Sequence, residues 1–186
     1  MRIVAGDFRG RPIAAPKTNG TRPTSDRARE TVFNILSHAE WAPPLAGARV
    51  IDLFAGSGAL GLEAISRGAD FALFVEMGLA ARAALLENIS VYGISEKAQF
   101  QRRDIMRLGA MSDDIEGPFD IAFIDPPYFK QLVPRSLAGL KAGGWLKAEA
   151  LCVVETGADE APELSGWTVR DTRKSGAAKF WFLSQA

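Results

Sequence analysis

The sequence predicts an α/β protein organised around a doubly wound, mostly parallel sheet. Short apolar segments of strand length alternate along the chain with longer segments of helical periodicity, which is typical of repeated βαβ units. A glycine-rich stretch, Asp52–Gly61, joins one such strand to the next helix, and open α/β sheets bind ligands at turns of this kind. The last two segments, Trp167–Lys174 and Ala178–Ser184, flank a turn at Ser175-Gly176 and are expected to add an antiparallel hairpin.

Each element follows from a local pattern. Residues 1–24 contain many Gly and Pro residues and few apolar runs, so only short extended pieces, Arg2–Ala5 and Arg11–Ala14, are expected there. Ser25 or Thr24 is placed to cap the helix that follows. The apolar positions of that helix are Val32, Phe33, Ile35 and Leu36. The predicted strands before the hairpin are Arg49–Phe54, Phe71–Glu76, Ala98–Arg103, Phe119–Asp125 and Ala150–Glu155, and the predicted helices between them are Ala59–Arg67, Leu79–Tyr92 and Leu132–Leu140.

Length and composition indicate an ordinary globular chain. Its 186 residues are 47% hydrophobic and 24% charged, enough to bury a substantial core. No apolar run approaches the roughly 18 residues that span a bilayer, and the chain begins without a signal-peptide pattern. The single cysteine, Cys152, excludes an internal disulfide, and His38 has no second histidine with which to share a metal. We expect a cytoplasmic protein with no metal site, divided by role into a basic arm and helix, residues 1–40, and a main domain, residues 41–186, on which the arm and helix pack.

The net charge of zero conceals basic ends on an acidic body. Residues 1–30 hold seven Lys and Arg against three acids, residues 166–186 hold four against one, and the middle of the chain is acidic. This asymmetry predicts a local patch for a polyanion. Arg9 and Arg11 lie on an arm that we expect to be mobile and extended, which suits contacts to phosphates.

The glycine-rich stretch favours a nucleotide-like cofactor. Gly56 and Gly58 tolerate positive φ angles and allow a ligand to approach the main chain. The helix that follows points free N–H groups and its positive dipole end at the same place. Because Gly56-x-Gly58-x-x-Gly61 also fits the NAD fingerprint, the spacing alone leaves NAD and S-adenosylmethionine open. Asp52, which is expected to end the preceding strand, favours a cofactor with a cationic group, such as the amino-acid end of S-adenosylmethionine.

Three further acids close successive predicted strands, and all should project from the same edge of the sheet. Glu76 follows the second strand, where a carboxylate can accept hydrogen bonds from ribose hydroxyls. Asp104 follows the third, where it can accept one from an adenine amine while Met77 and Ile105 enclose the ring. Asp125 closes the fourth. Acids at corresponding strand ends favour a shared binding role over separate roles in turns.

Asp125-Pro126-Pro127-Tyr128 is the most specific short motif. The two prolines fix φ and remove two N–H donors, so a rigid turn presents carbonyl oxygens. The Asp125 carboxylate and the Pro126 carbonyl are acceptors that can receive an exocyclic amine, while Tyr128 stacks on the base that carries it. Holding the amine in this way would aim its lone pair at a methyl donor.

Together these residues resemble a class I S-adenosylmethionine-dependent methyltransferase of the type that methylates amines, with a Rossmann-like, seven-stranded, mostly parallel sheet. The block Arg22–Leu36, with Arg2–Gly6 and Arg9-Gly10-Arg11 upstream, narrows the resemblance to the bacterial RsmD family of small-subunit (16S) rRNA guanine-N2 methyltransferases. The resemblance runs nearly end to end. Its N-terminal block is the specific part, because Asp-Pro-Pro-Tyr is shared with DNA adenine-N6 and cytosine-N4 methyltransferases.

The resemblance implies methylation of a guanine N2 amine in small-subunit rRNA within the assembling 30S particle, with the basic arm docking the RNA. A small domain whose two basic ends serve RNA is expected to act as a monomer. The implied cofactor-binding residues are Asp52, Phe54, Ala55, Gly56, Ser57, Gly58, Glu76, Met77, Asp104 and Ile105. The implied catalytic residues are Asp125, Pro126, Pro127 and Tyr128. The candidate RNA-binding residues are Arg9, Arg11, Arg22 and Arg27.

Other functions fit the sequence less well. A DNA amino-methyltransferase usually carries a target-recognition insert, and only the N-terminal arm is available for that role. A non-catalytic assembly factor that binds RNA or the cofactor would not need the amine receptor at Asp125–Tyr128. An NAD oxidoreductase would need a hydride-transfer acid, such as a placed His or a Tyr-Lys pair, and no such pattern is present.

Overall fold

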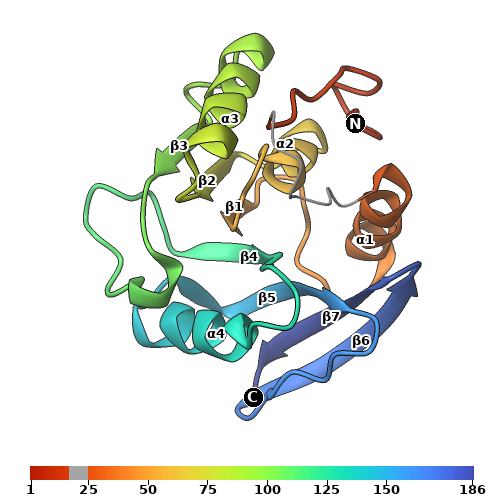
Figure 1. Cartoon of the computed structure of the whole chain (residues 1–186), viewed down its shortest axis with the longest axis vertical. Coiled ribbons are helices and arrows are strands. Elements are labelled where there is room, and N and C mark those ends of the chain that lie inside the picture. The colour runs from red at the N-terminus through yellow and green to blue at the C-terminus, as the bar shows by residue number, and fades with distance from the viewer. Residues whose placement is uncertain (17–24) are drawn as a thin grey trace.

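The computed structural model describes residues 1–16 and 25–186 and shows a seven-stranded sheet with helices on both faces (Figure 1). The helices are α1 (Asp26–His38), α2 (Ala59–Ser66), α3 (Leu79–Tyr92), the 3-10 helix η1 (Ile105–Arg107) and α4 (Leu132–Ala142), and the strands are β1 (Arg49–Leu53), β2 (Phe71–Val75), β3 (Ala98–Gln101), β4 (Phe119–Ile124), β5 (Leu146–Gly157), β6 (Trp167–Ser175) and β7 (Ala178–Gln185). The strand order is β3-β2-β1-β4-β5-β7-β6. Strands β1 to β5 run parallel and β7 is antiparallel to β5 and β6, which confirms the predicted fold.

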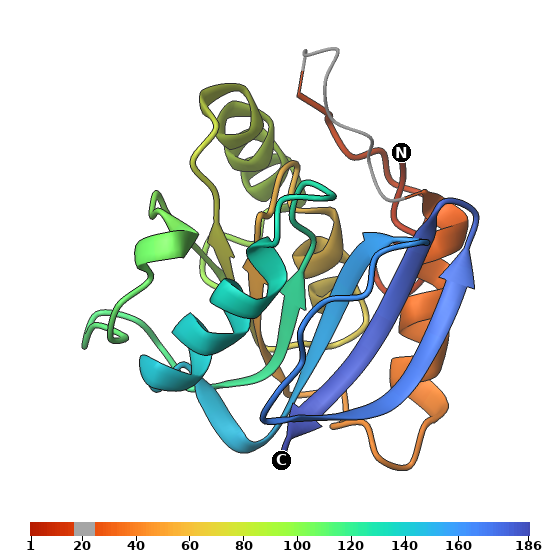
Figure 2. The same cartoon turned by 60° about the horizontal axis from the view of Figure 1, so that its bottom comes forward.

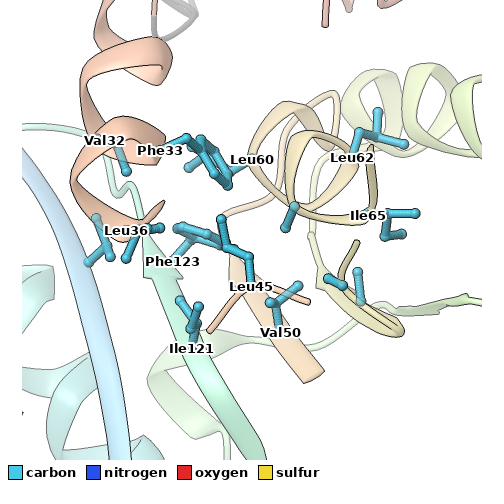
Figure 3. Packing of buried hydrophobic residues seen from close by; sticks show 14 of the residues in the cluster. Val32, Phe33, Leu36, Leu45, Val50, Leu60, Leu62, Ile65, Ile121 and Phe123 are labelled. Atoms are coloured by element: carbon cyan, nitrogen blue, oxygen red, sulfur yellow. The ribbon is translucent and has the colours of Figure 1, made fainter. Parts of the chain in front are cut away.

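The helices divide between the two faces of the sheet because side chains alternate along each strand. Helices α1, α2 and α3 cover one face, where Phe33 of α1 packs against Phe123 of β4 with ring centroids 5.5 Å apart. Figure 3 shows α1 and α2 meeting over β1 and β4 on this face. Helix α4 and η1 cover the other face, where Leu137 and Trp145 are buried. With both faces covered, the strand ends and loops remain as the surfaces for binding.

Several elements end at different residues from those expected. Strand β1 ends at Leu53, β2 at Val75, β3 at Gln101 and β4 at Ile124, whereas β5 extends from Leu146 to Gly157. Phe54 leaves the strand because its φ is 62°. Asp104 lies beyond the end of β3 and caps η1 by accepting a hydrogen bond from the Met106 N–H at 2.9 Å.

The arm at residues 1–16 is packed against the main domain, which corrects the expectation that it is mobile. Ile3 is buried in the same apolar cluster as α1 and α2. The buried carboxylate of Glu63 on α2 accepts hydrogen bonds from the N–H groups of Val4 at 2.8 Å and Ala5 at 3.0 Å. The described part of the arm and the main domain therefore share one core.

Strands β5, β7 and β6 lie beside α1 at one end of the sheet (Figure 2). The antiparallel pairing of Gly157 with Ala178 brings the start of β7 to the carboxyl end of β5. The turn between β6 and β7 consequently lies at the same sheet edge as the carboxyl ends of the parallel strands. The C-terminal hairpin thus reaches the edge where ligands are expected.

Candidate active site

The carboxyl ends of β2, β1 and β4 are aligned in one row across the sheet, and β5 joins this row at Val154, three residues before its own end. The paired residues of that row are Val75, Leu53, Ile124 and Val154. The residues that follow them are Glu76, Phe54, Asp125 and Glu155. Because adjacent strands lie only about 4.8 Å apart, three carboxyl groups share one edge of the sheet. The structure therefore brings Glu76 and Asp125 to a common edge, as expected from the sequence.

The glycine-rich turn after β1 is held from two sides by side chains of neighbouring elements. Glu76 accepts hydrogen bonds from the Gly56 N–H at 2.8 Å through Oε2 and from the Gly78 N–H at 2.6 Å through Oε1. Asn88 of α3 donates through Nδ2 to the Ser57 carbonyl at 2.9 Å. The conformation of the turn is thus fixed by β2 and α3 together.

Asp52 lies inside β1, one residue before its end, rather than at the strand terminus. Its side chain is only 1% exposed. Oδ2 accepts a hydrogen bond from the Gly61 N–H at 3.0 Å, and Oδ1 is buried with no hydrogen-bond partner among the described residues. Burial raises the pKa of Asp52 to about 7, opposed by the hydrogen bond from Gly61 and reinforced by the charge of Glu76. A buried acid that titrates near neutrality therefore lies beneath the turn.

Two glycines of the motif are required by packing, and a third leaves the backbone open. A Cβ on Gly58, whose φ is 82°, would lie 2.5 Å from the Leu85 side chain. A Cβ on Gly61 would lie 2.3 Å from the ring of Phe74. Gly56, with φ 57°, has no such neighbour closer than 3.9 Å. Gly56 is consequently the point of the turn where a ligand can approach the main chain.

Asp125-Pro126-Pro127-Tyr128 leaves β4 and borders two hollows. Asp125 is half-buried, Pro126 is buried and Pro127 is exposed. The Tyr128 hydroxyl donates a hydrogen bond to Glu155 Oε1 at 2.5 Å. Tyr128 and Glu155 line both a hollow of about 640 Å³ beside α4 and a second one of about 430 Å³, here called the outer hollow. The outer hollow lies between the first turn of α1 and the β6–β7 turn.

The residues predicted to hold an adenine ring differ in their exposure. Met77 is 48% exposed beside the edge of the sheet, and Asp104 is exposed. Ile105 is only 5% exposed and belongs to the apolar cluster beneath α4. Met77 and Asp104 are therefore accessible to a ligand, whereas Ile105 mainly packs the core.

The arginines predicted to contact RNA fall in two places. Arg27 is exposed in the first turn of α1 and lines the outer hollow. Arg11 lies at the C-terminal end of α3, where its guanidinium is 4.3 Å from the Tyr92 ring centroid and donates to a backbone carbonyl of α3 at 2.7 Å. Arg9, two residues earlier, is exposed. Tyr92 ends α3 (Figure 1), one helical turn beyond Asn88, and neither Arg9 nor Arg11 lines the outer hollow. Arg22 lies outside the described residues.

Sequence reasoning missed Glu155 and Asn88. Glu155 carries the same signal as the other acids, because it closes the predicted strand Ala150–Glu155, and the rule applied to every strand end finds it. Asn88 carries no such signal. It lies within a helix, and its hydrogen-bond partners Ser57 and Ala14 are 31 and 74 residues away in the sequence.

Some kinds of site are absent from the described part of the chain. Within residues 1–16 and 25–186, no group of three or more His, Cys, Asp or Glu residues is arranged to hold a metal ion. Cys152 is fully buried, and burial raises the pKa of its thiol, so it is not a reactive nucleophile. None of the helices in these ranges is long and apolar enough to cross a membrane.

The fold and the site define a class I methyltransferase. The sheet order is the one expected for that class, and the glycine-rich turn after β1 and the acids that follow β2 and β4 lie together at its carboxyl edge. The solved structure of ribosomal protein L11 methylase from Lactobacillus delbrueckii subsp. bulgaricus shares the fold at 16% identity, with a TM-score of 0.68 over 90% of this chain and 82% of that chain.

The chain belongs to the family described as Conserved hypothetical protein 95, whose model matches residues 1–184. Ribosomal RNA small subunit methyltransferase D of Escherichia coli (strain K12) is 40% identical over 84% of this chain and 74% of that protein. The protein of the same name from Haemophilus influenzae is 32% identical over 97% of this chain and 91% of that protein. The solved structure of Escherichia coli yhhF gives a TM-score of 0.80 at 33% identity, over 100% of this chain and 97% of that chain. These findings confirm the resemblance to the RsmD family.

Proposed function

We propose that this protein transfers a methyl group from S-adenosylmethionine to the exocyclic N2 amine of a guanine in small-subunit (16S) rRNA. The observation that carries the proposal is the position of Asp125, which lies in one strand-end row with Glu76, next to the glycine-rich turn. The names of the E. coli and H. influenzae relatives support the class of substrate. The proposal includes action as a monomer in the cytoplasm on the assembling 30S particle.

The residues around the turn fit S-adenosylmethionine. Gly56 leaves the backbone open, and the negative charge of Asp52 beneath it, with one unpartnered oxygen, suits the ammonium end of the methionine part. The Glu76 carboxylate at the end of β2 suits the ribose hydroxyls, while the exposed side chains of Met77 and Asp104 suit the adenine. S-adenosylmethionine, when bound, supplies an electrophilic methyl group.

The residues after β4 would position the amine that receives this methyl group. The lone pair of the guanine N2 amine is delocalised into the ring, so the amine is a weak nucleophile. Hydrogen bonds to the Asp125 carboxylate and the Pro126 carbonyl would favour a more tetrahedral nitrogen and orient its lone pair. Stacking on Tyr128 would contribute about 1–3 kcal/mol to holding the base. The guanine must be single-stranded or flipped to reach this position, because a duplex buries its edge.

Methyl transfer from labelled S-adenosylmethionine to three substrates tests the proposal. The substrates are small subunits that lack the modification, naked small-subunit rRNA and duplex DNA. The expected result is label in the subunit or its RNA, mapped to guanine N2. Label in DNA alone would assign the chemistry of Asp125–Tyr128 to a DNA enzyme, and cofactor binding without any transfer would favour a non-catalytic assembly factor.

The Asp125→Ala variant separates the receptor from the cofactor site. The variant should lose methyl transfer while its affinity for S-adenosylhomocysteine stays close to that of the wild type, because Asp125 belongs to the amine receptor. Calorimetry measures the affinity, and unchanged turnover would remove Asp125 from the mechanism.

A further inference from the structure

Glu155 is a second carboxylate beside the position of the target amine, and the roles described above do not use it. It follows Val154 on β5 as Asp125 follows Ile124 on β4, and Val154 and Ile124 are paired in register. Neighbouring strands lie about 4.8 Å apart. Asp125, just after the end of β4, and Glu155, within the last residues of β5, are therefore neighbours across the sheet.

The Glu155 side chain projects from the face of the sheet that α1 covers. Phe123 of β4 and Val153 of β5 belong to the apolar cluster beneath α1, and the residue after each belongs to the opposite cluster. Because side chains alternate along a strand, Glu155, which lies within β5, returns to the α1 face. The outer hollow, which lies beside α1 and includes Glu155 in its lining, agrees with this direction.

Glu155 is held against the ring predicted to stack on the base. Glu155 is only 6% exposed, and its Oε1 accepts a hydrogen bond from the Tyr128 hydroxyl at 2.5 Å. Both residues line the two hollows at this edge. A base stacked on Tyr128 consequently has this carboxylate within reach of its edge.

The three polar groups at this edge offer acceptors of the kind that guanine requires. The carboxylates of Asp125 and Glu155, when ionised, and the Pro126 carbonyl accept hydrogen bonds but donate none. Guanine presents two neighbouring kinds of donor, the N2 amine and the N1–H. Adenine and cytosine instead place an unprotonated ring nitrogen beside their amine, and a carboxylate repels its lone pair.

We infer that Glu155 accepts a hydrogen bond from the N1–H of the target guanine and so selects guanine over adenine and cytosine. The inference rests on the proposed function, because it names the base that the same site recognises. It assigns the choice of base to β5, whereas Asp125-Pro126-Pro127-Tyr128 only receives the amine.

RNA that carries 2-aminopurine at the modified position tests the inference, because this base keeps the N2 amine but has an unprotonated N1. Wild-type enzyme first maps the methylated guanine, and ligated RNA with either base at that position is then assembled into small subunits. The kcat/KM for each base is measured for wild type, Glu155→Gln and the matched control Glu149→Gln, which changes an exposed acid near the start of β5.

Wild type should prefer guanine by about tenfold or more, the size expected for a hydrogen bond to a charged group. Glu155→Gln should narrow or reverse this preference, because the amide N–H donates to the unprotonated N1, and Glu149→Gln should retain it. An equal loss of activity on both bases in Glu155→Gln, or a wild type without preference, would overturn the inference. The first of these outcomes would leave Glu155 only the task of orienting Tyr128.

Two other outcomes, failure of the proposed function and misfolding of the variant, are distinguished from failure of the inference. A wild type that methylates no guanine refutes the proposed function itself rather than the role of Glu155. If Glu155→Gln loses S-adenosylhomocysteine binding and is therefore misfolded, Glu155→Asp replaces it, since aspartate keeps an acceptor on a shorter side chain. This variant should keep the preference for guanine at a lower rate, and loss of the preference would overturn the inference.

Discussion

Asp52 and Gly61 are joined by a hydrogen bond of 3.0 Å between the strand carboxylate and a backbone N–H in the first turn of α2. That N–H is one of the donors that a helix leaves unpaired at its start. The residue at the N-cap position is Gly58, which has no side chain to accept it. Asp52, on the preceding strand, therefore takes the place of the missing N-cap side chain. This role requires it to be buried beneath the turn.

The raised pKa of Asp52 predicts a pH-dependent stability. Between the ordinary value of 3.8 and the folded value of about 7, the folded state binds a proton more tightly than the unfolded chain. The contribution of Asp52 therefore makes the free energy of unfolding fall as pH rises through this window, by up to about 1.4 kcal/mol per pH unit, and become constant above it. Asp52→Asn keeps an oxygen for Gly61 and removes this contribution.

Urea denaturation of wild type and Asp52→Asn at pH 5, 6, 7 and 8 measures the effect. As pH rises, the free energy of unfolding of Asp52→Asn should increase relative to that of the wild type. A difference that is the same at every pH would show that Asp52 does not titrate between pH 5 and pH 8 in the folded protein. Because a neutral side chain no longer complements an ammonium group, calorimetry should also show weaker S-adenosylhomocysteine binding by the variant at pH 8.

The close approach of Gly61 to Phe74 predicts opposite effects of the same substitution in two helices. Alanine normally stabilises a helix interior relative to glycine by up to about 1 kcal/mol. Gly139→Ala in α4 should show this gain, because its Cβ would meet Leu108 at an ordinary 3.5 Å. Gly61→Ala should instead lower stability by about 1–3 kcal/mol, because its Cβ would lie 2.3 Å from the Phe74 ring.

Thermal unfolding of both alanine variants decides the matter. A higher melting temperature for Gly61→Ala would mean that the Phe74 ring moves aside without loss of stability. Packing would then not require a glycine at this position, which would leave ligand binding as its role. A shift to lower temperature, with Gly139→Ala shifted upward, would show that this glycine of the motif is fixed by packing.

The sequence predicted the fold because its signals are local. Strand-length apolar runs, the glycine-rich turn and the Ser175-Gly176 turn each depend on residues close in the chain, and the sheet contains all the predicted strands. Strand ends were less accurate, since Phe54 adopts a positive φ that its residue type does not announce. The start of β5 was missed because Leu146 pairs with Phe119 across the chain.

The site was predictable only where residue type and strand position coincide. Glu76 and Asp125 are acids directly after buried strands, and the structure places both at the expected edge. The contacts that hold the arm were not predictable, because they come from Glu63 and Asn88, which reach it from helices far along the chain. For the same reason, the sequence could not show that Arg11 lies against the C-terminal end of α3.

The separation of the two groups of arginines predicts unequal effects on RNA. Arg27→Ala should raise the KM for the RNA substrate and reduce the salt dependence of binding by about one counterion, because Arg27 lines the outer hollow next to Tyr128. Arg9→Ala should change both less, since Arg9 lies two residues from the contact of Arg11 with α3. Methyl-transfer kinetics measure the KM, and filter binding at several salt concentrations measures the salt dependence of RNA affinity. Equal losses of RNA affinity in the two variants would extend the RNA-binding surface along the arm.

Asn88 connects the N-terminal arm to the glycine-rich turn. It is 2% exposed, its Nδ2 donates to the carbonyls of Ala14 and Ser57, and its Oδ1 accepts from the Ala14 N–H. Asn88→Ala should lower the free energy of unfolding by about 1–3 kcal/mol, because it leaves buried polar groups unsatisfied. It should also weaken S-adenosylhomocysteine binding, because the Ser57 carbonyl loses its anchor.

Asn88→Asp divides these two effects. The carboxylate still accepts from the Ala14 N–H but can donate to neither the Ala14 nor the Ser57 carbonyl, so the arm should keep one of its two hydrogen bonds to this side chain while the Ser57 carbonyl loses its donor. Proteolysis of the arm and calorimetry with S-adenosylhomocysteine report on the two ends separately. Asn34→Ala, at an exposed position of α1, is the control and should leave both unchanged. Wild-type affinity in both Asn88 variants would show that Asn88 holds only the arm, and that Glu76 alone fixes the turn for the cofactor.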